Sequence, residues 1–210
     1  MRAIQEWRNG MLAAVITLAA GLALAEETAH PKAKVSFEDF KGLVAEVESH
    51  RAERLVDLDT FLRMSREPDT IILDTRSTFR YERIHIKGAK HLSFTDFTQD
   101  ALRGVIPSFD TRVLIYCNNN FEGNPVDFAS KIAMPMARPP VATTNPASMR
   151  NTFRLSRQFA TQEKPLMMAL NIPTYINLFG YGYHNVYELD ELVDVSDPRV
   201  EFEGSLVGRP

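Results

Sequence analysis

Val113-Leu114-Ile115-Tyr116-Cys117 is the stretch that decides the fold, because an uninterrupted run of large hydrophobic residues leads directly into the cysteine. A second such run, Ile71-Ile72-Leu73, precedes it in the chain. Strands covered on both faces of a parallel sheet read as continuous apolar runs, not as alternating ones. Segments with helical spacing separate these runs. We therefore predict an α/β fold, an open and mostly parallel sheet with helices on both faces.

The other elements are expected from capping residues and hydrophobic spacing. Ser36 with Asp39 is typical of a helix N-terminus, and Asn124-Pro125 is a good pair to open a helix toward Met134. The first of these helices should run through 50, and Asp59 should cap the next one. Further helices are expected at 60–65, 78–83, 96–104, 149–160 and 173–180, and further strands at 55–58, 90–94, 166–170 and 186–189. Because ligands bind beyond the carboxyl ends of parallel strands, Cys117 lies where a site is expected.

The N-terminus has the features of a secretory signal peptide. Arg2 and Arg8 precede an almost wholly apolar run over 11–24, which ends in Ala23-Leu24-Ala25. A run of about 14 residues is shorter than the roughly 20 of a permanent membrane helix, and small residues favour cleavage after Ala25. We expect a periplasmic or secreted protein with no membrane span after cleavage. An uncleaved anchor is the alternative.

The cysteine count and the charge restrict the function. The chain has 210 residues, one cysteine and a net charge of -3. A single cysteine cannot close a disulfide within the chain, so in an oxidising compartment it is either buried and inert or kept for its reactivity. The acidic balance gives no argument for a nucleic-acid partner.

The segment after this strand suggests a chemistry for Cys117. A loop of six residues separates the thiol from the next expected helix. These residues are Asn118, Asn119, Asn120, Phe121, Glu122 and Gly123. The backbone N–H groups of such a loop and of a helix N-terminus carry partial positive charge, which favours a thiolate. A thiolate held in this way can attack an electrophilic sulfur and keep the transferred atom as a persulfide. The alternative is a buried cysteine that packs as a small apolar side chain.

Three motifs in order resemble those of rhodanese-like domains, which are sulfurtransferases and their inactive relatives. They are Asp74-Thr75-Arg76 with Tyr81 and His85-Ile86-Lys87-Gly88-Ala89, the strand that leads to Cys117, and the turn Gly182-Tyr183-His184-Asn185-Val186-Tyr187. The resemblance implies a five-stranded parallel sheet, Cys117 as the catalytic residue and the amides of 118–123 as an anion cradle. It also implies structural roles for the motif residues Asp74, Arg76, His85 and Gly88, the first two as a buried ion pair.

The resemblance also divides the chain. A signal peptide at 1–25 and an N-terminal helical extension at 26–54 precede a rhodanese-like domain at 55–192, and a C-terminal tail covers 193–210. An insertion at about 131–164 makes the chain between Cys117 and Gly182 longer than is usual in the family. Its only acid is Glu163, and its basic residues are Lys131, Arg138, Arg150, Arg154, Arg157 and Lys164.

Two departures from the family concern charge. The loop after Cys117 has no Arg or Lys and contains Glu122, and Arg80 stands where the family usually has an acid. Our hypothesis is that Arg150, Arg154 and Arg157, which share one helix face at i, i+4 and i+7, lie over the loop and bind the anion instead. The alternative is a solvated basic face without a role.

Several other sites are disfavoured. Cysteine-dependent phosphatases need an Arg six positions after the Cys, where this chain has Gly123. His85 and His91 lack a third ligand at suitable spacing, so we expect no metal, and we expect no cofactor. The aromatic residues near the C-terminus are interpreted as core, with a partner surface as the alternative; they are Tyr175, Phe179, Tyr181 and Tyr183.

The leading hypothesis is therefore a periplasmic sulfurtransferase. Cys117 would take sulfane sulfur from a small donor and pass it to a thiol acceptor. A second hypothesis is a catalytically inactive rhodanese-like module that recognises a partner protein. A third is redox sensing, in which the thiol forms a sulfenic acid or a mixed disulfide.

Overall fold

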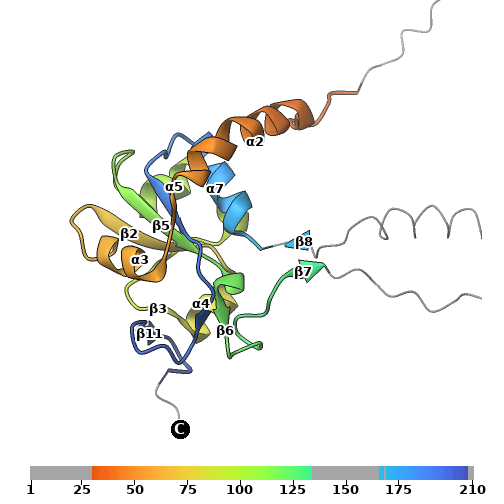
Figure 1. The fold of residues 1–210 in the computed structure, drawn as a ribbon. Helices are drawn as coiled ribbons and strands as arrows, with labels where there is room; N and C mark the ends of the chain where they lie inside the picture. The colour runs from red at the N-terminus through yellow and green to blue at the C-terminus, as the bar shows by residue number, and fades with distance from the viewer. Residues whose placement is uncertain (1–29, 134–165, 168, 208–210) are drawn as a thin grey trace, which may run out of the picture. The chain divides into compact units, whose positions relative to one another are not determined.

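A five-stranded parallel sheet forms the centre of the computed structural model, which describes residues 30–133, 166–167 and 169–207 (Figure 1). Residues 1–36 and 37–210 form two compact units, and the elements below all belong to the second. In spatial order the strands are β1 (Leu55–Val56), β9 (Val186–Leu189), β5 (Arg112–Tyr116), β2 (Thr70–Asp74) and β4 (Lys90–His91). The predicted fold class is confirmed.

The register of the two central strands places the site. β2 and β5 pair from Thr70↔Arg112 to Asp74↔Tyr116, so both strands end at the same level. Cys117 follows immediately after Tyr116, and Thr75 and Arg76 follow Asp74. The Asp-x-Arg motif and the cysteine therefore meet at the carboxyl edge of the sheet.

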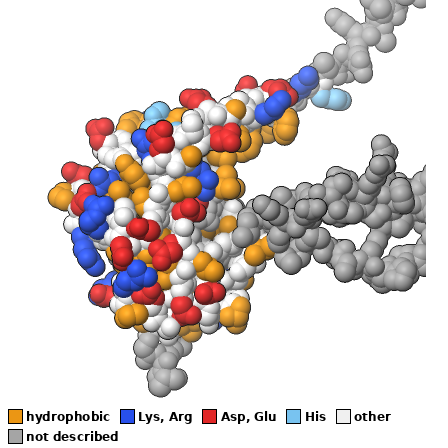
Figure 2. Space-filling model, viewed as in Figure 1, with side chains coloured by type: hydrophobic (Ala, Val, Ile, Leu, Met, Phe, Trp, Pro, Cys, Tyr) orange, Lys and Arg blue, Asp and Glu red, His pale blue; other side chains and the backbone are white. Residues whose placement is uncertain are grey.

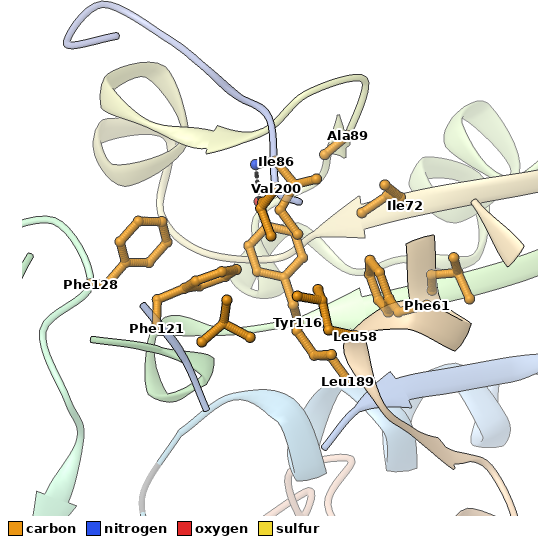
Figure 3. Packing of buried hydrophobic residues seen from close by; sticks show 12 residues of the cluster. Leu58, Phe61, Ile72, Ile86, Ala89, Tyr116, Phe121, Phe128, Leu189 and Val200 are labelled. Atoms are coloured by element: carbon orange, nitrogen blue, oxygen red, sulfur yellow. Dashed lines mark hydrogen bonds between the residues drawn. The ribbon is translucent and has the colours of Figure 1, made fainter. Parts of the chain in front are cut away.

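Both faces of the sheet are covered, because the side chains of β5 alternate between two buried clusters. Val113 and Ile115 belong to the cluster that also contains residues of α2 (Phe37–Ala52), α5 (Gln99–Val105) and α7 (Asn171–Gly180). Leu114 and Tyr116 belong to the other cluster, with residues of α3 (Leu58–Met64) and Tyr81 of α4 (Thr78–Arg83). Figure 3 shows the second cluster around Tyr116, whose hydroxyl accepts the N–H of Ile86 at 3.1 Å.

Leu43 and the second half of α2 pack on the domain, whereas the outer part of the helix is largely exposed. Val47 is 1% exposed, whereas Phe37 is 78%, Phe40 47% and Val44 39% exposed. Hydrophobic side chains are visible along the outer half of this helix in Figure 2, where acidic and basic side chains are intermixed on the rest of the face shown. The helix is present as predicted, but its apolar stripe is only partly buried.

The helix starts differ from the predicted ones by a few residues. α3 is capped by Asp57, not Asp59: the Asp57 side chain accepts the N–H of Thr60 at 2.8 Å. Thr98 caps α5 in the same way, because a 3-10 turn, η1 (Phe94–Asp96), uses the residues expected to open the helix. α4 and β9 have the predicted bounds.

The helix predicted from Asn124-Pro125 is wrong within the described residues. The Asn124 side chain accepts the N–H of Asp127 at 3.1 Å, as in a helix cap, but only a single turn forms. The segment after this turn is hydrogen-bonded to the loop that follows Cys117, since the Lys131 N–H donates to Asn119 Oδ1 at 2.8 Å. It continues into β7 (Ile132–Ala133), which pairs antiparallel with β8 (Leu166–Met167).

The residues after β9 are part of the domain. β10 (Val193–Asp194) pairs with β6 (Phe121–Glu122), and β11 (Phe202–Glu203) pairs with β3 (His85–Ile86). Val193 is 2% exposed and Val200 is 7% exposed, so both contribute to the core. The sequence gives little sign of these strands, because two residues are too few to show a periodicity.

Several predicted features lie outside the described residues. These are the signal peptide at 1–25, most of the insertion, the helix at 149–160 and its residues Arg150, Arg154 and Arg157. Within the described part of the chain, no helix combines the length and the apolar character needed to cross a membrane.

Candidate functional site at the carboxyl edge of the sheet

Cys117 is buried at the end of β5. Its side chain is 1% exposed, and Sγ accepts the N–H of Leu170, which immediately precedes α7, at 3.4 Å. Burial raises the pKa of the thiol, although the N–H groups of Leu170 and Asn118 and the charge of Lys131 act in the opposite direction. Desolvation thus exceeds the effect of the nearby dipoles, so the pKa of the thiol does not favour the thiolate that the loop sequence suggests.

The loop after Cys117 closes on itself. Asn118–Asn120 form a 3-10 turn, η2, in which the Asn120 N–H donates to the Cys117 carbonyl at 3.1 Å and the Phe121 N–H donates to the Asn118 carbonyl. These two amides donate to carbonyl groups of the turn itself. Of the predicted cradle, the N–H of Asn118 acts on Sγ.

The second half of the predicted cradle, 121–123, is part of the packed domain and of strand β6. Phe121 is 1% exposed and packs against Tyr116 and Phe128, and Glu122 is exposed in β6. Gly123 has a φ of +87°, and a Cβ there would lie 3.1 Å from a methyl group of Val195. A residue other than glycine would be strained in this conformation.

The three asparagine side chains attach the loop to three different parts of the domain. Asn118 Oδ1 accepts from the Arg76 guanidinium at 3.4 Å, and Asn119 accepts the N–H of Lys131. Asn120 Oδ1 accepts the N–H of Cys117 at 2.9 Å and that of the Asn171 amide at 2.9 Å, and its Nδ2 donates to the Leu189 carbonyl at 2.8 Å. The side chains thus fix the conformation of the loop.

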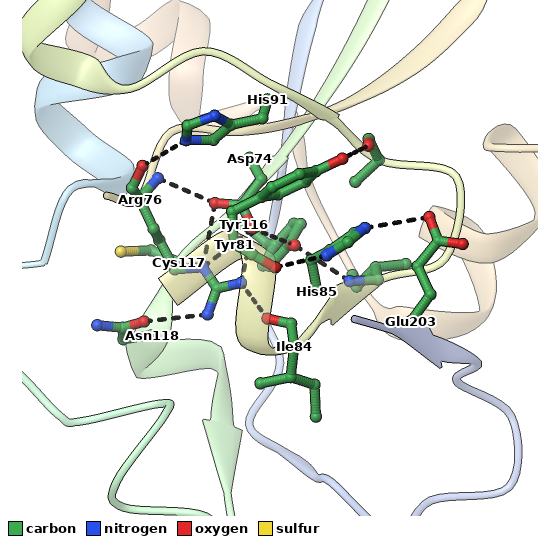
Figure 4. A network of polar contacts seen from close by, with 12 residues as sticks. Asp74, Arg76, Tyr81, Ile84, His85, His91, Tyr116, Cys117, Asn118 and Glu203 are labelled. Atoms are coloured by element: carbon green, nitrogen blue, oxygen red, sulfur yellow. Dashed lines mark hydrogen bonds and ion pairs between the residues drawn. The ribbon is translucent and has the colours of Figure 1, made fainter. Parts of the chain in front are cut away.

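A buried ion pair lies beneath the loop. Arg76 is 2% exposed and donates to the Asp74 carboxylate, with its shortest contact at 2.7 Å. Its guanidinium also donates to the Ile84 carbonyl at 2.6 Å, and the Tyr116 hydroxyl donates to Asp74 at 2.5 Å. Burial disfavours the guanidinium charge, but the Asp74 hydrogen bonds outweigh it and raise the pKa of Arg76. Figure 4 shows this pair between Cys117 and Asn118 on one side and His85 and Glu203 on the other.

Ring stacking and hydrogen bonds fix the positions of the two histidines of the motif region. The Tyr81 ring stacks between the rings of His85 and His91, at centroid distances of 3.8 and 4.6 Å. His85 contacts the Tyr81 carbonyl and the Glu203 carboxylate, and His91 contacts the Arg76 carbonyl. The N–H of Gly88 lowers the pKa of Glu203, which joins β11 to the motif. Among the described residues, no group of three potential ligands is suitable for a metal ion.

A pocket of about 500 Å³ opens at this edge of the sheet. Its basic members are Arg76, Arg80 and Lys131, and its hydroxyl groups come from Thr75, Ser77, Ser93, Thr95 and Ser130. Asn118, Phe94, Ala129 and Leu170 complete the lining. Cys117 does not line the pocket, but Asn118 and Leu170, whose N–H groups act on its sulfur, do.

Sequence reasoning missed this pocket as a unit. In the sequence, Arg80 is only a departure from the family pattern, and Lys131 is only one of the basic residues of the expected insertion. In the structure both residues line one pocket, and the Lys131 N–H is bonded to Asn119. The one available signal was the replacement of an acid by Arg80.

Sequence and structure comparisons relate this chain to known proteins. Residues 57–134 match the rhodanese-like domain family. A crystal structure of the BH2092 protein from Bacillus halodurans is similar at 16% identity and a TM-score of 0.29, over 42% of this chain and 65% of that one. The chain thus spans slightly less than two thirds of that relative, and no curated protein matches it significantly. The family match includes the Asp-x-Arg motif, Cys117 and the loop that follows it.

Proposed function

We propose that this protein is a rhodanese-like binding module in which Cys117 is a packing residue. The observation that carries the proposal is the burial of the thiol: its side chain is 1% exposed, its pKa is raised, and the pocket is lined by its neighbours but not by Cys117 itself. A neutral, enclosed thiol is a poor nucleophile, because the thiolate is the reactive form.

The hydrogen bonds around the loop support the same proposal. Asn120 links Cys117, Leu189 and Asn171, so exposure of the sulfur requires several buried bonds to be broken together. Such satisfied networks rigidify a site. A binding module benefits from rigidity, because less conformational entropy is lost when the ligand binds.

A persulfide-forming sulfurtransferase is the second candidate, and one observation favours it. The N–H groups of Leu170 and Asn118 act on Sγ, and both residues line the pocket, so the sulfur lies directly behind its wall. In the reaction with thiosulfate, the Cys117 thiolate would attack the outer sulfur of the donor. A new S–S bond would form, and sulfite would leave with the electron pair of the broken bond. A nucleophilic acceptor thiol would then remove the sulfur.

Intact mass separates the two candidates. The protein is incubated with thiosulfate or polysulfide, alongside a Cys117→Ser variant. The binding module predicts no added sulfur and slow labelling by iodoacetamide that becomes fast in urea. A gain of one sulfur atom that is absent from Cys117→Ser would replace the binding proposal with the sulfurtransferase. Glutathione adducts without persulfide would instead indicate redox sensing.

We also propose that the protein is exported. The support is the sequence of Arg2 and Arg8, the apolar run after them and the small residues that end at Ala25. N-terminal sequencing of the protein from a periplasmic extract should begin at Glu26. A chain that retains Met1 and sediments with membranes would contradict cleavage.

A further inference from the structure

The pocket at the carboxyl edge differs from two other pockets of the described domain in the kind of charge that lines it. None of its described lining residues is Asp or Glu, although the chain as a whole has a net charge of -3. Two other pockets of the described domain include carboxylates: Glu201 lines one, and Glu188 and Asp190 line the other. What distinguishes this pocket from those two is that its described lining contains basic side chains and no carboxylate.

Two of its three cations form no ion pair with a carboxylate of the described residues. Arg76 is committed to Asp74, but Arg80 and Lys131 form no ion pair within the part of the chain that the structure describes. The neighbouring Arg83 is paired, since its guanidinium contacts Asp127 at 2.5 Å. Neither charge is paired at contact distance by a described carboxylate, although Arg80 helps to lower the pKa of Asp127, so both can interact with a negatively charged ligand.

The size and the remaining lining define that ligand further. Ser77, Ser93 and Thr95 supply hydroxyl groups, which can donate to oxygen atoms, and Phe94 and Leu170 supply apolar surface. A volume of about 500 Å³ lies in the range of sites for small organic molecules, roughly 300–1,000 Å³. An inorganic oxyanion alone would leave most of this volume and its apolar wall unused.

From this juxtaposition we propose that the pocket binds a small organic anion. Its oxyanion group, a sulfonate or a carboxylate, is held by Arg80, Lys131 and the hydroxyl groups, and its apolar body packs on Phe94 and Leu170. The inference rests on the proposed binding function and names the class of ligand. Of the basic residues expected in the insertion it uses Lys131 alone, and it does not use the cysteine.

Calorimetric titration of the full protein with sodium benzenesulfonate and with sodium sulfate, at matched ionic strength, tests the inference. Benzenesulfonate should bind at least several-fold more tightly than sulfate. Arg80→Gln and Lys131→Gln should each weaken its binding about tenfold or more, because each removes a charge-assisted contact. The control is Arg103→Gln, which removes an exposed arginine of α5 and should leave the affinity unchanged.

The apolar wall has its own test. Phe94→Ala should weaken benzenesulfonate binding and leave sulfate binding unchanged, provided that the circular dichroism spectrum and melting temperature match the parent protein. Equal affinities for the two anions would overturn the assignment of an organic ligand. No binding by the parent, or unchanged binding by the Arg80→Gln, Lys131→Gln double variant, would overturn the site itself.

The Cys117→Ser variant separates this inference from the proposed function. Unchanged benzenesulfonate binding by that variant is expected. If the parent protein also acquires a persulfide, the binding-module proposal fails while the anion site stands. If the parent acquires none and the double variant still binds like the parent, the anion site fails while the proposed function stands.

Discussion

The ion-pair network beneath the loop and the pocket above it use the same kinds of side chain in opposite ways. Below the loop, Arg76 is 2% exposed and its charge is matched by Asp74, by a carbonyl and by Asn118. In the pocket, Arg80 and Lys131 form no ion pair with a carboxylate of the described region. A matched buried charge maintains a structure, whereas unmatched cations around a cavity are suited to an external anion.

The largest expected effect lies in the network. Asp74→Ala leaves the buried Arg76 guanidinium without its counter-charge, and such a loss costs about 3–5 kcal/mol. Urea denaturation followed by circular dichroism measures the change in the free energy of unfolding. Glu201→Ala, which breaks the exposed pair with Lys87, is the matched control and should change stability little. Equal losses in both variants would remove the distinction between the network and the surface.

A smaller effect is expected at Asn120. Its replacement by Ala leaves the buried N–H of Cys117 without its acceptor and the Leu189 carbonyl without a donor, which should cost about 1–3 kcal/mol. The looser loop should also let iodoacetamide reach Cys117 faster. Asn185→Ala, which removes an exposed bond to the Asp110 carbonyl, serves as the control for both measurements. An unchanged labelling rate in a destabilised Asn120→Ala protein would show that the loop does not control access.

The smallest effect concerns the pH dependence of Cys117. Because burial raises its pKa above the usual 9.0, the folded state holds the proton more tightly than the unfolded state does. The resulting stability is complete below the usual pKa and is lost as pH rises through the raised value. We therefore expect the unfolding free energy of the parent to fall relative to that of Cys117→Ala between about pH 7 and about pH 10. A parent protein that gains stability over this interval would indicate a stabilised thiolate.

Sequence patterns predicted the central strands well. The apolar runs at 71–73 and 113–116 need cover on both faces, which a parallel sheet with two helical layers supplies. The two strands lie side by side in register, as their pairing shows. The less successful predictions concern places where local signals compete with distant contacts. Asn124 caps a turn as its sequence suggests, but contact with Asn119 draws the chain into β7 instead of a helix.

The sequence alone determined the α/β fold, the position of Cys117 after a buried strand and the motif that contains Asp74 and Arg76. These follow from hydrophobic runs and short motifs, which act over a few residues. Only the tertiary structure decided whether the thiol was exposed, where the three asparagines point and which cations share a pocket. The free energy of a charge depends on burial and on neighbours within a few ångströms, and those neighbours come from distant parts of the chain.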